Sequence, residues 1–149
     1  MNPVTGLSLA RIGIGALALA RPDTAAQAFG LDPASNPQAT YVTRLFGSRE
    51  IALGTITLLS RGKARPGIVL LGVGVDAADV ATGYLGPKEG QVSTKAGATL
   101  VGPAILAVLM GLAGLRPAKS REKKAAAKAA AKSERKLEKK AAKKLAKAA

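Results

Sequence analysis

Six charged side chains interrupt the apolar stretches in the first 115 residues. They are three arginines and three carboxylates: Arg11, Arg44, Arg49, Glu50, Asp76 and Asp79. An ionisable group inside an apolar segment is costly, so it is expected either to pair with an opposite charge or to serve a function. The six charges sum to zero, which favours mutual pairing in a structural network. The alternative is a polar site for a lipid headgroup or small anion, or a proton-coupled carboxylate.

The spacing of these residues predicts which of them meet. Asp76 and Asp79 are three positions apart, so they share one face of a helix. Arg49 lies at a depth similar to that of Asp79 along its own segment. We therefore expect an ion pair of Arg49 with Asp79 or with Asp76, with two hydrogen bonds available to the guanidinium.

Small residues extend the faces that carry the charges. One stripe of the first segment holds Ser8, Arg11, Gly15 and Ala18, and Arg44 shares a predicted face with Gly47 and Ile51. Glycines at such positions allow helices in lipid to approach closely. The glycines predicted to pack helices are Gly47, Gly54, Gly72 and Gly83.

The chain lacks the residue types that several kinds of chemistry require. The chain has no cysteine, histidine or tryptophan, which excludes disulfides, Cys/His zinc sites and Ser-His nucleophiles. Residues 71–78, LGVGVDAA, contain the spacing of a dinucleotide-binding motif, but a polar loop follows where that motif requires a βαβ unit. We expect a non-enzymatic protein with no cofactor and no metal.

Four apolar segments must position the charged residues. They cover residues 4–20, 40–60, 67–86 and 96–115, and a helix of roughly twenty residues crosses a bilayer core. The first and last show no polar face, which disfavours a soluble helical bundle. The sequence therefore predicts an all-α fold, a four-transmembrane-helix bundle over residues 1–115, with a short amphipathic turn near residues 25–31 in the first linker.

Basic residues predict the orientation. Residues 1–115 contain nine basic and six acidic side chains, a net charge of +3, whereas residues 116–149 contain fourteen and three, a net charge of +11. The basic loop 61–66 and this tail lie on the same side of four spans. By the positive-inside rule that side is cytoplasmic. We expect a multi-pass protein of a bacterial cytoplasmic membrane with both termini in the cytoplasm.

The basic tail, residues 116–149, has the composition of a helix with one cationic face. Its lysines recur every four residues: Lys124, Lys128, Lys132, Lys136, Lys140 and Lys144. Such a face favours the anionic inner leaflet of the membrane or an acidic partner. Non-specific binding to nucleic acid and a merely solvated charge run remain alternatives.

Residues 44–54, RLFGSREIALG, carry an R-x-x-G-x-R-E-x-x-x-G motif. With Arg11 and the Asp76–Asp79 pair, this motif resembles a family of small, uncharacterised four-helix membrane proteins, a domain of unknown function of actinobacterial type. The resemblance covers the body and not the tail. It implies the four-span fold and brings no activity.

The sequence favours an accessory or scaffold subunit, alone, as a homo-oligomer or within a larger membrane complex. Two alternatives remain open. One is a small transporter or lipid-binding protein that uses the intramembrane Arg, Asp and Glu residues. The other is a membrane tether that binds nucleic acid through its basic tail.

Overall fold

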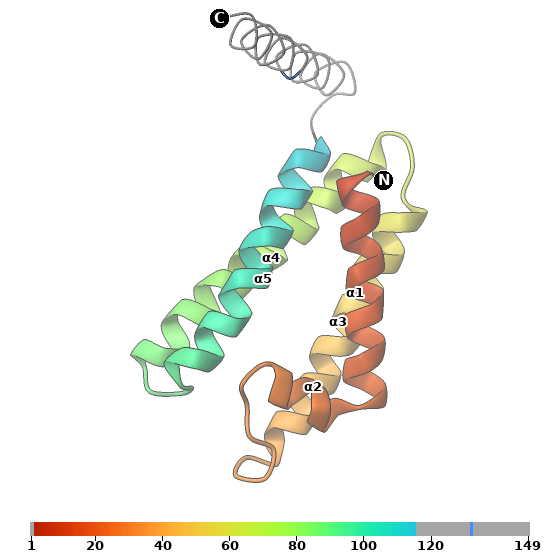
Figure 1. Cartoon of the computed structure of the whole chain (residues 1–149). Helices are drawn as coiled ribbons and strands as arrows, with labels where there is room; N and C mark the ends of the chain where they lie inside the picture. Colours follow the sequence, from red (N-terminus) through yellow and green to blue (C-terminus); the bar gives the residue numbers. More distant parts are fainter. Residues whose placement is uncertain (1, 116–131, 133–149) are drawn as a thin grey trace, which may run out of the picture. The chain divides into compact units, whose positions relative to one another are not determined.

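The computed structural model describes residues 2–115 and Lys132, and the regular structure of these residues is entirely helical. The body, residues 2–115, forms five helices (Figure 1). They are α1 (Pro3–Ala20), α2 (Pro22–Ala28), α3 (Gln38–Leu59), α4 (Ala64–Lys88) and α5 (Thr94–Leu115). The all-α prediction is confirmed, and the four long helices match the four apolar segments.

Local sequence explains where the first two helices begin. The Asn2 side chain accepts a hydrogen bond from the Val4 amide at 3.1 Å, which caps α1. Pro3 and Pro22 occupy first-turn positions, where a missing amide hydrogen costs nothing. The turn predicted near residues 25–31 begins earlier, as the short helix α2, and ends in a loop.

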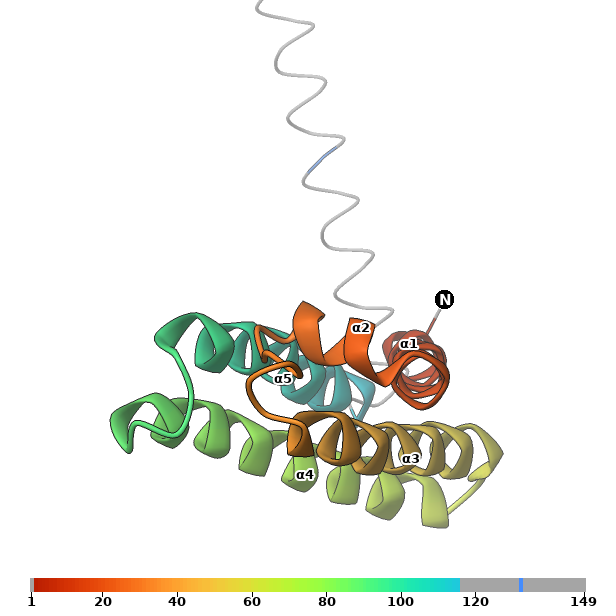
Figure 2. The ribbon, with the colours of Figure 1, turned by 90° about the horizontal axis from the view of Figure 1, so that it is seen from below.

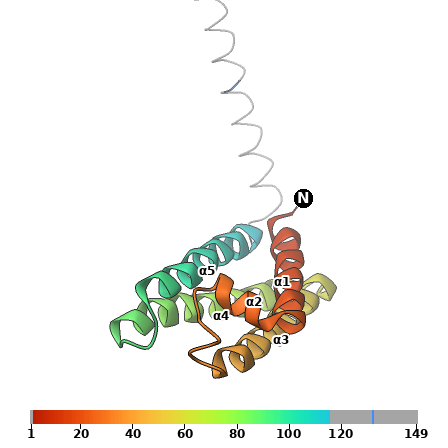
Figure 3. The ribbon, with the colours of Figure 1, turned by 60° about the horizontal axis from the view of Figure 1, so that its bottom comes forward.

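The four long helices run alternately up and down. The start of α1, the α3–α4 loop and the end of α5 lie at one end of the body, whereas α2 and the α4–α5 turn lie at the other (Figure 1). Seen from the α2 end, α2 lies between the α1/α3 pair and the α4/α5 pair (Figures 2 and 3).

Glycines bring the helices of each pair into backbone contact. A Cβ atom on Gly15 would lie 2.5 Å from the Gly47 carbonyl oxygen, and one on Gly54 would lie 2.6 Å from that of Ser8. In the other pair, a Cβ on Gly83 would lie 2.8 Å from the Val101 side chain. Only glycine fits such close crossings, so the packing roles predicted for Gly47, Gly54 and Gly83 are confirmed.

Contacts between the two pairs are much sparser than those within them. Gly72 faces this looser region, and nothing within 4 Å would meet a Cβ atom there or on Gly74. The prediction that Gly72 packs against a neighbouring helix is therefore wrong. Close glycine contacts need a facing helix, and α4 presents its glycine face to α5 only at Gly83.

The crossing loop, residues 29–31, links the two pairs at the α2 end. Gly30 has a φ of 77°, a left-handed conformation that favours glycine. A Cβ on Gly30 would lie 3.1 Å from the Ala96 Cα atom at the start of α5. Both the conformation and the close approach therefore require glycine at this position.

The distribution of apolar side chains is reversed relative to a soluble protein. The buried apolar residues are small, nearly all alanine, whereas large side chains such as Leu59, Leu70 and Leu106 are 53–72% exposed. A surface of this kind faces lipid without penalty, because lipid tails are as apolar as leucine.

Three helices, α1, α4 and α5, are long and apolar enough to cross a membrane, which makes the body a multi-pass membrane protein. The helix α3 has 22 residues, enough length to cross, but its three charged residues keep it outside this group.

The predicted cationic face of the tail lies outside the described residues except at one position. Lys132 is helical and exposed. Lys124, Lys128, Lys136, Lys140 and Lys144 lie outside the described residues.

Candidate functional site

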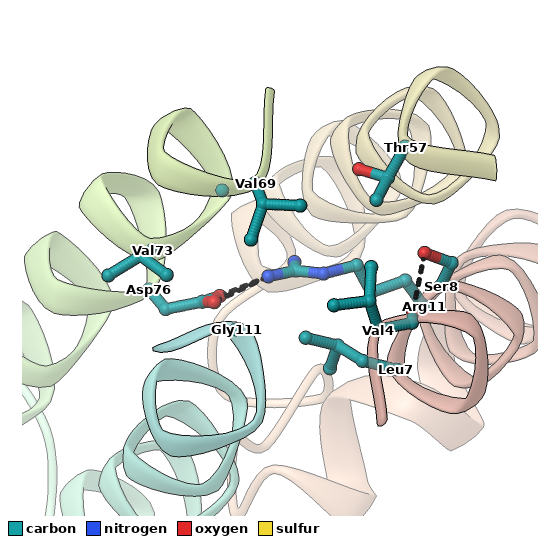
Figure 4. Close-up of a pocket in the computed structure, with 10 residues that line it drawn as sticks. Val4, Leu7, Ser8, Arg11, Thr57, Val69, Val73, Asp76 and Gly111 are labelled. Carbon is teal, nitrogen blue, oxygen red and sulfur yellow. Dashed lines mark hydrogen bonds and ion pairs between the residues drawn. The ribbon is translucent and has the colours of Figure 1, made fainter. Parts of the chain in front are cut away.

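Arg11 of α1 joins two helices that approach it from different sides. Its Nη1 donates to Glu50 Oε2 of α3 at 2.6 Å, and its Nη2 donates to both Asp76 carboxylate oxygens of α4, at 2.5 and 2.6 Å. The side chains are only 8%, 7% and 5% exposed. Figure 4 shows the Arg11–Asp76 contact crossing between the helix pairs. This three-residue contact is the buried centre of the site.

Arg49 of α3 forms a second, less buried link to α4. Its Nη1 and Nη2 donate to the two Asp79 oxygens at 3.0 and 2.7 Å, a bidentate pair that confirms one of the predicted pairings. Arg49 Nη2 also lies 3.3 Å from Glu50 Oε1. The Arg49 and Asp79 side chains are 36% and 29% exposed. Arg49 therefore connects the buried centre to a more open region.

Arg44 does not belong to this network. Its side chain is exposed, and within residues 2–115 it forms no ion pair. The buried face of α3 runs instead through Ala39, Thr43, Gly47, Glu50 and Gly54. The face predicted for Arg44, Gly47 and Ile51 was thus rotated by about one residue.

Because Arg44 lies outside the network, the network is not electrically neutral. The connected network holds two arginines and three carboxylates, a net charge of −1 when all are ionised. The prediction that all six charges pair with one another is therefore wrong at Arg44. An uncompensated charge in a low-dielectric interior is costly.

Two buried polar atoms in the network form no hydrogen bond, Arg49 Nε and Glu50 Oε1. The Glu50 side chain is only 7% exposed, so this oxygen is withdrawn from solvent. A buried acceptor without a donor costs about 1–3 kcal/mol. The network is closed around Arg11 and incompletely satisfied around Arg49 and Glu50.

A cleft of about 510 Å³ lies between the two helix pairs, in the half of the body nearer α2. Its walls are mostly apolar and come from all four long helices and the crossing loop. The wall residues include Leu7, Ala10, Ile14, Phe29, Leu31, Val42, Leu45, Phe46, Leu100, Pro103, Ala104 and Ala107. All five network residues also border it. This volume lies within the roughly 300–1,000 Å³ of small-molecule sites.

A much smaller cavity lies beyond Arg11 and Asp76, which border both spaces. It has a volume of about 20 Å³. Val4 and Ser8 of α1 and Val69 and Val73 of α4 enclose it (Figure 4). About 10–15 Å³ accommodates one water molecule. The Arg11–Asp76 contact thus separates the large cleft from a water-sized space.

The cleft also gathers the phenylalanines of the chain, which number only two. Phe29 of the crossing loop and Phe46 of α3 pack edge to face, with ring centroids 5.3 Å apart. The Arg49 guanidinium carbon lies 5.1 Å from the Phe46 centroid, a cation–π contact. The sequence did not predict this aromatic cluster. The rarity of aromatic residues in the chain was the one feature that could have indicated it.

Within residues 2–115, the structure supports neither a dinucleotide-binding site nor a metal site. The 71–78 motif lies inside α4, where no strand precedes it, so the dinucleotide interpretation has no structural basis. Among residues 2–115, no group of acidic side chains is placed to hold a metal ion.

A family model of a domain of unknown function, DUF4267, matches residues 8–115. The chain belongs to the DUF4267 family. The matched range contains the whole charge network and all of the cleft lining except Leu7, and it ends before the tail. Comparison with curated proteins and with solved structures finds no match. The predicted resemblance is confirmed at the level of a DUF4267 domain of unknown function.

Proposed function

We propose that this protein is a non-enzymatic membrane protein that binds an amphiphilic small molecule in the cleft between its helix pairs. The observation that carries the proposal is a cleft of about 510 Å³ with apolar walls and a charged inner end. A molecule with an apolar body and one polar group matches both parts. This role corresponds to the small transporter or lipid-binding protein, one of the two alternatives that the sequence left open.

The charge network favours binding over a purely structural role. A structural lock is best served by a neutral, fully hydrogen-bonded network. Here the network has a net charge of −1, and Glu50 Oε1 accepts no hydrogen bond. The partly exposed Arg49 and Asp79 border the cleft rather than a packed interface. The buried Arg11 contact supplies the structural part, and the Arg49 side supplies the binding part.

The membrane arrangement belongs to the same proposal. We place α3 across the membrane as the fourth span, because two of its three charges are paired and its length matches that of α5. The basic loop 61–66 and the basic tail then face the cytoplasm of a bacterial cell. In this arrangement the cleft lies in the outer half of the membrane.

An accessory role within a larger membrane complex is compatible with ligand binding. The tail, with a net charge of +11, would hold the cytoplasmic side against anionic lipid. Each basic residue near such a surface contributes about 1 kcal/mol.

Mass spectrometry of the intact protein, extracted with its lipids, tests the proposal. We expect a bound small molecule in the unchanged protein, and its loss in Ala10→Phe, which fills the cleft. Ala16→Phe is the matched control, because Ala16 is an equally exposed alanine of α1 that does not border the cleft. Identical bound species in both variants would contradict a site in the cleft.

A further inference from the structure

The net charge of the network limits which ligand the cleft can accept. With its two arginines and three carboxylates ionised, the network carries −1. A bound anion would change the net charge of network and ligand to −2 in an apolar cleft, whereas a bound cation would bring that net charge to zero. The terminal nitrogens of both guanidinium groups are already bound to carboxylates, and the remaining donor of Arg49, its Nε, is buried. Charge complementarity therefore favours a cation.

The aromatic side chains favour an organic cation over a metal ion. Phe29 and Phe46 place ring faces and edges at the cleft, and Phe46 already contacts the Arg49 guanidinium. Aromatic faces attract quaternary ammonium and similar cations, more strongly when water is excluded. The apolar walls suit substituents around such a charge.

The acceptor for this cation is Asp79 of α4, the most exposed carboxylate of the network. Glu50 Oε1 of α3 accepts no hydrogen bond but is buried, so it attracts the cation only through its charge. Arg49 Nη2 lies near both carboxylates, 3.3 Å from Glu50 Oε1 and 2.7 Å from Asp79 Oδ2.

Few other charges act on these carboxylates. Arg11 faces them from α1, Arg49 from α3 and Asp76 from α4. Neither α5 nor the crossing loop contributes a charged side chain to the cleft. A cation bound in the cleft would therefore neutralise the network.

We infer that the cleft binds an apolar organic cation beside Asp79, an inference that rests on the proposed function. The network carries a net charge of −1 when the cleft is empty and becomes neutral when the cation is bound. The apolar substituents of the cation lie against the apolar walls of the cleft.

The test uses two probes of nearly equal shape and opposite charge, tetraphenylphosphonium and tetraphenylborate. Equilibrium dialysis with the full chain in phosphatidylcholine nanodiscs, corrected for empty nanodiscs, gives both affinities. We expect the cation to bind at least tenfold more tightly than the anion.

Asp79→Asn removes the surplus charge and should lower cation affinity at least tenfold. Asp23→Asn is the matched control, because Asp23 is an exposed aspartate of α2 that binds Thr40 outside the cleft. If Asp79→Asn does not fold, the two-probe comparison on the unchanged protein still decides.

Each contrary result has a distinct meaning. Equal or tighter binding of the anion overturns the cation inference and leaves the cleft as a binding site. An unchanged cation affinity in Asp79→Asn overturns the placement of the cation beside Asp79. Failure of both probes, with no bound molecule lost in Ala10→Phe, overturns the proposed function as well.

Discussion

Replacement of Arg11 by methionine should destabilise the body more than any other single change in the network. Among residues 2–115, Arg11 is the only cation that contacts both Glu50 and Asp76, and all three side chains are at most 8% exposed. The substitution leaves two buried carboxylates with Arg49 as the nearest cation. Breaking a buried ion pair from one side costs about 3–5 kcal/mol.

The matched comparison is Arg49→Met. Arg49 is 36% exposed and its partner Asp79 is 29% exposed, so solvent screens the pair. A partly exposed pair contributes about 1 kcal/mol or less. The two variants should therefore differ by about 2 kcal/mol or more, roughly a thirtyfold difference in the unfolding equilibrium.

Reversible unfolding by sodium dodecyl sulfate in mixed micelles, followed by circular dichroism, measures both free energies. Adding Glu50→Gln and Asp76→Asn should recover much of the stability lost in Arg11→Met. If Arg11→Met costs no more than Arg49→Met, Arg11 is not the structural centre and the division of the network into two parts is wrong.

Three further changes probe other features. Gly47→Ala should cost about 1–3 kcal/mol, because its Cβ would lie 2.8 Å from the Gly15 carbonyl oxygen, whereas Gly13→Ala, with no neighbour within 4 Å, should be nearly neutral in the same unfolding assay. Arg44→Gln should change stability by less than about 0.5 kcal/mol, as expected of an exposed, unpaired residue, and a larger loss would place it back in the network. Deletion of residues 117–149 should abolish salt-sensitive binding to anionic liposomes in sedimentation; loss of binding to DNA alone would indicate the nucleic-acid tether instead.

The sequence predicted features that depend on one helix or on the depth of facing residues. The stripe Ser8, Arg11, Gly15 and Ala18 is buried as expected, because helical periodicity alone decides which side chains share a face. The Arg49–Asp79 pair followed from similar depth in antiparallel segments.

Features that depend on how the helix pairs cross were not predictable. The partners of Arg11, the open space beside Gly72 and the cleft itself depend on the separation of the α1/α3 and α4/α5 pairs, which no local pattern encodes. The predicted position of Arg44 was wrong for a simpler reason. A rotation of α3 by one residue, about 100°, takes a side chain from the interior to the surface.

The unequal packing of the helices has a consequence for how the protein is made. Each pair is a hairpin whose helices fit closely, so each can enter the membrane as a unit. The first hairpin brings Arg11, Arg49 and Glu50 to the interface, a surplus of positive charge, and the second brings Asp76 and Asp79. Neither hairpin by itself can pair all of its charged residues. Docking of the second hairpin onto the first is therefore the step of biogenesis at which the aspartates acquire their arginines, and a chain arrested before that step would present unpaired charges to the quality-control machinery of the membrane.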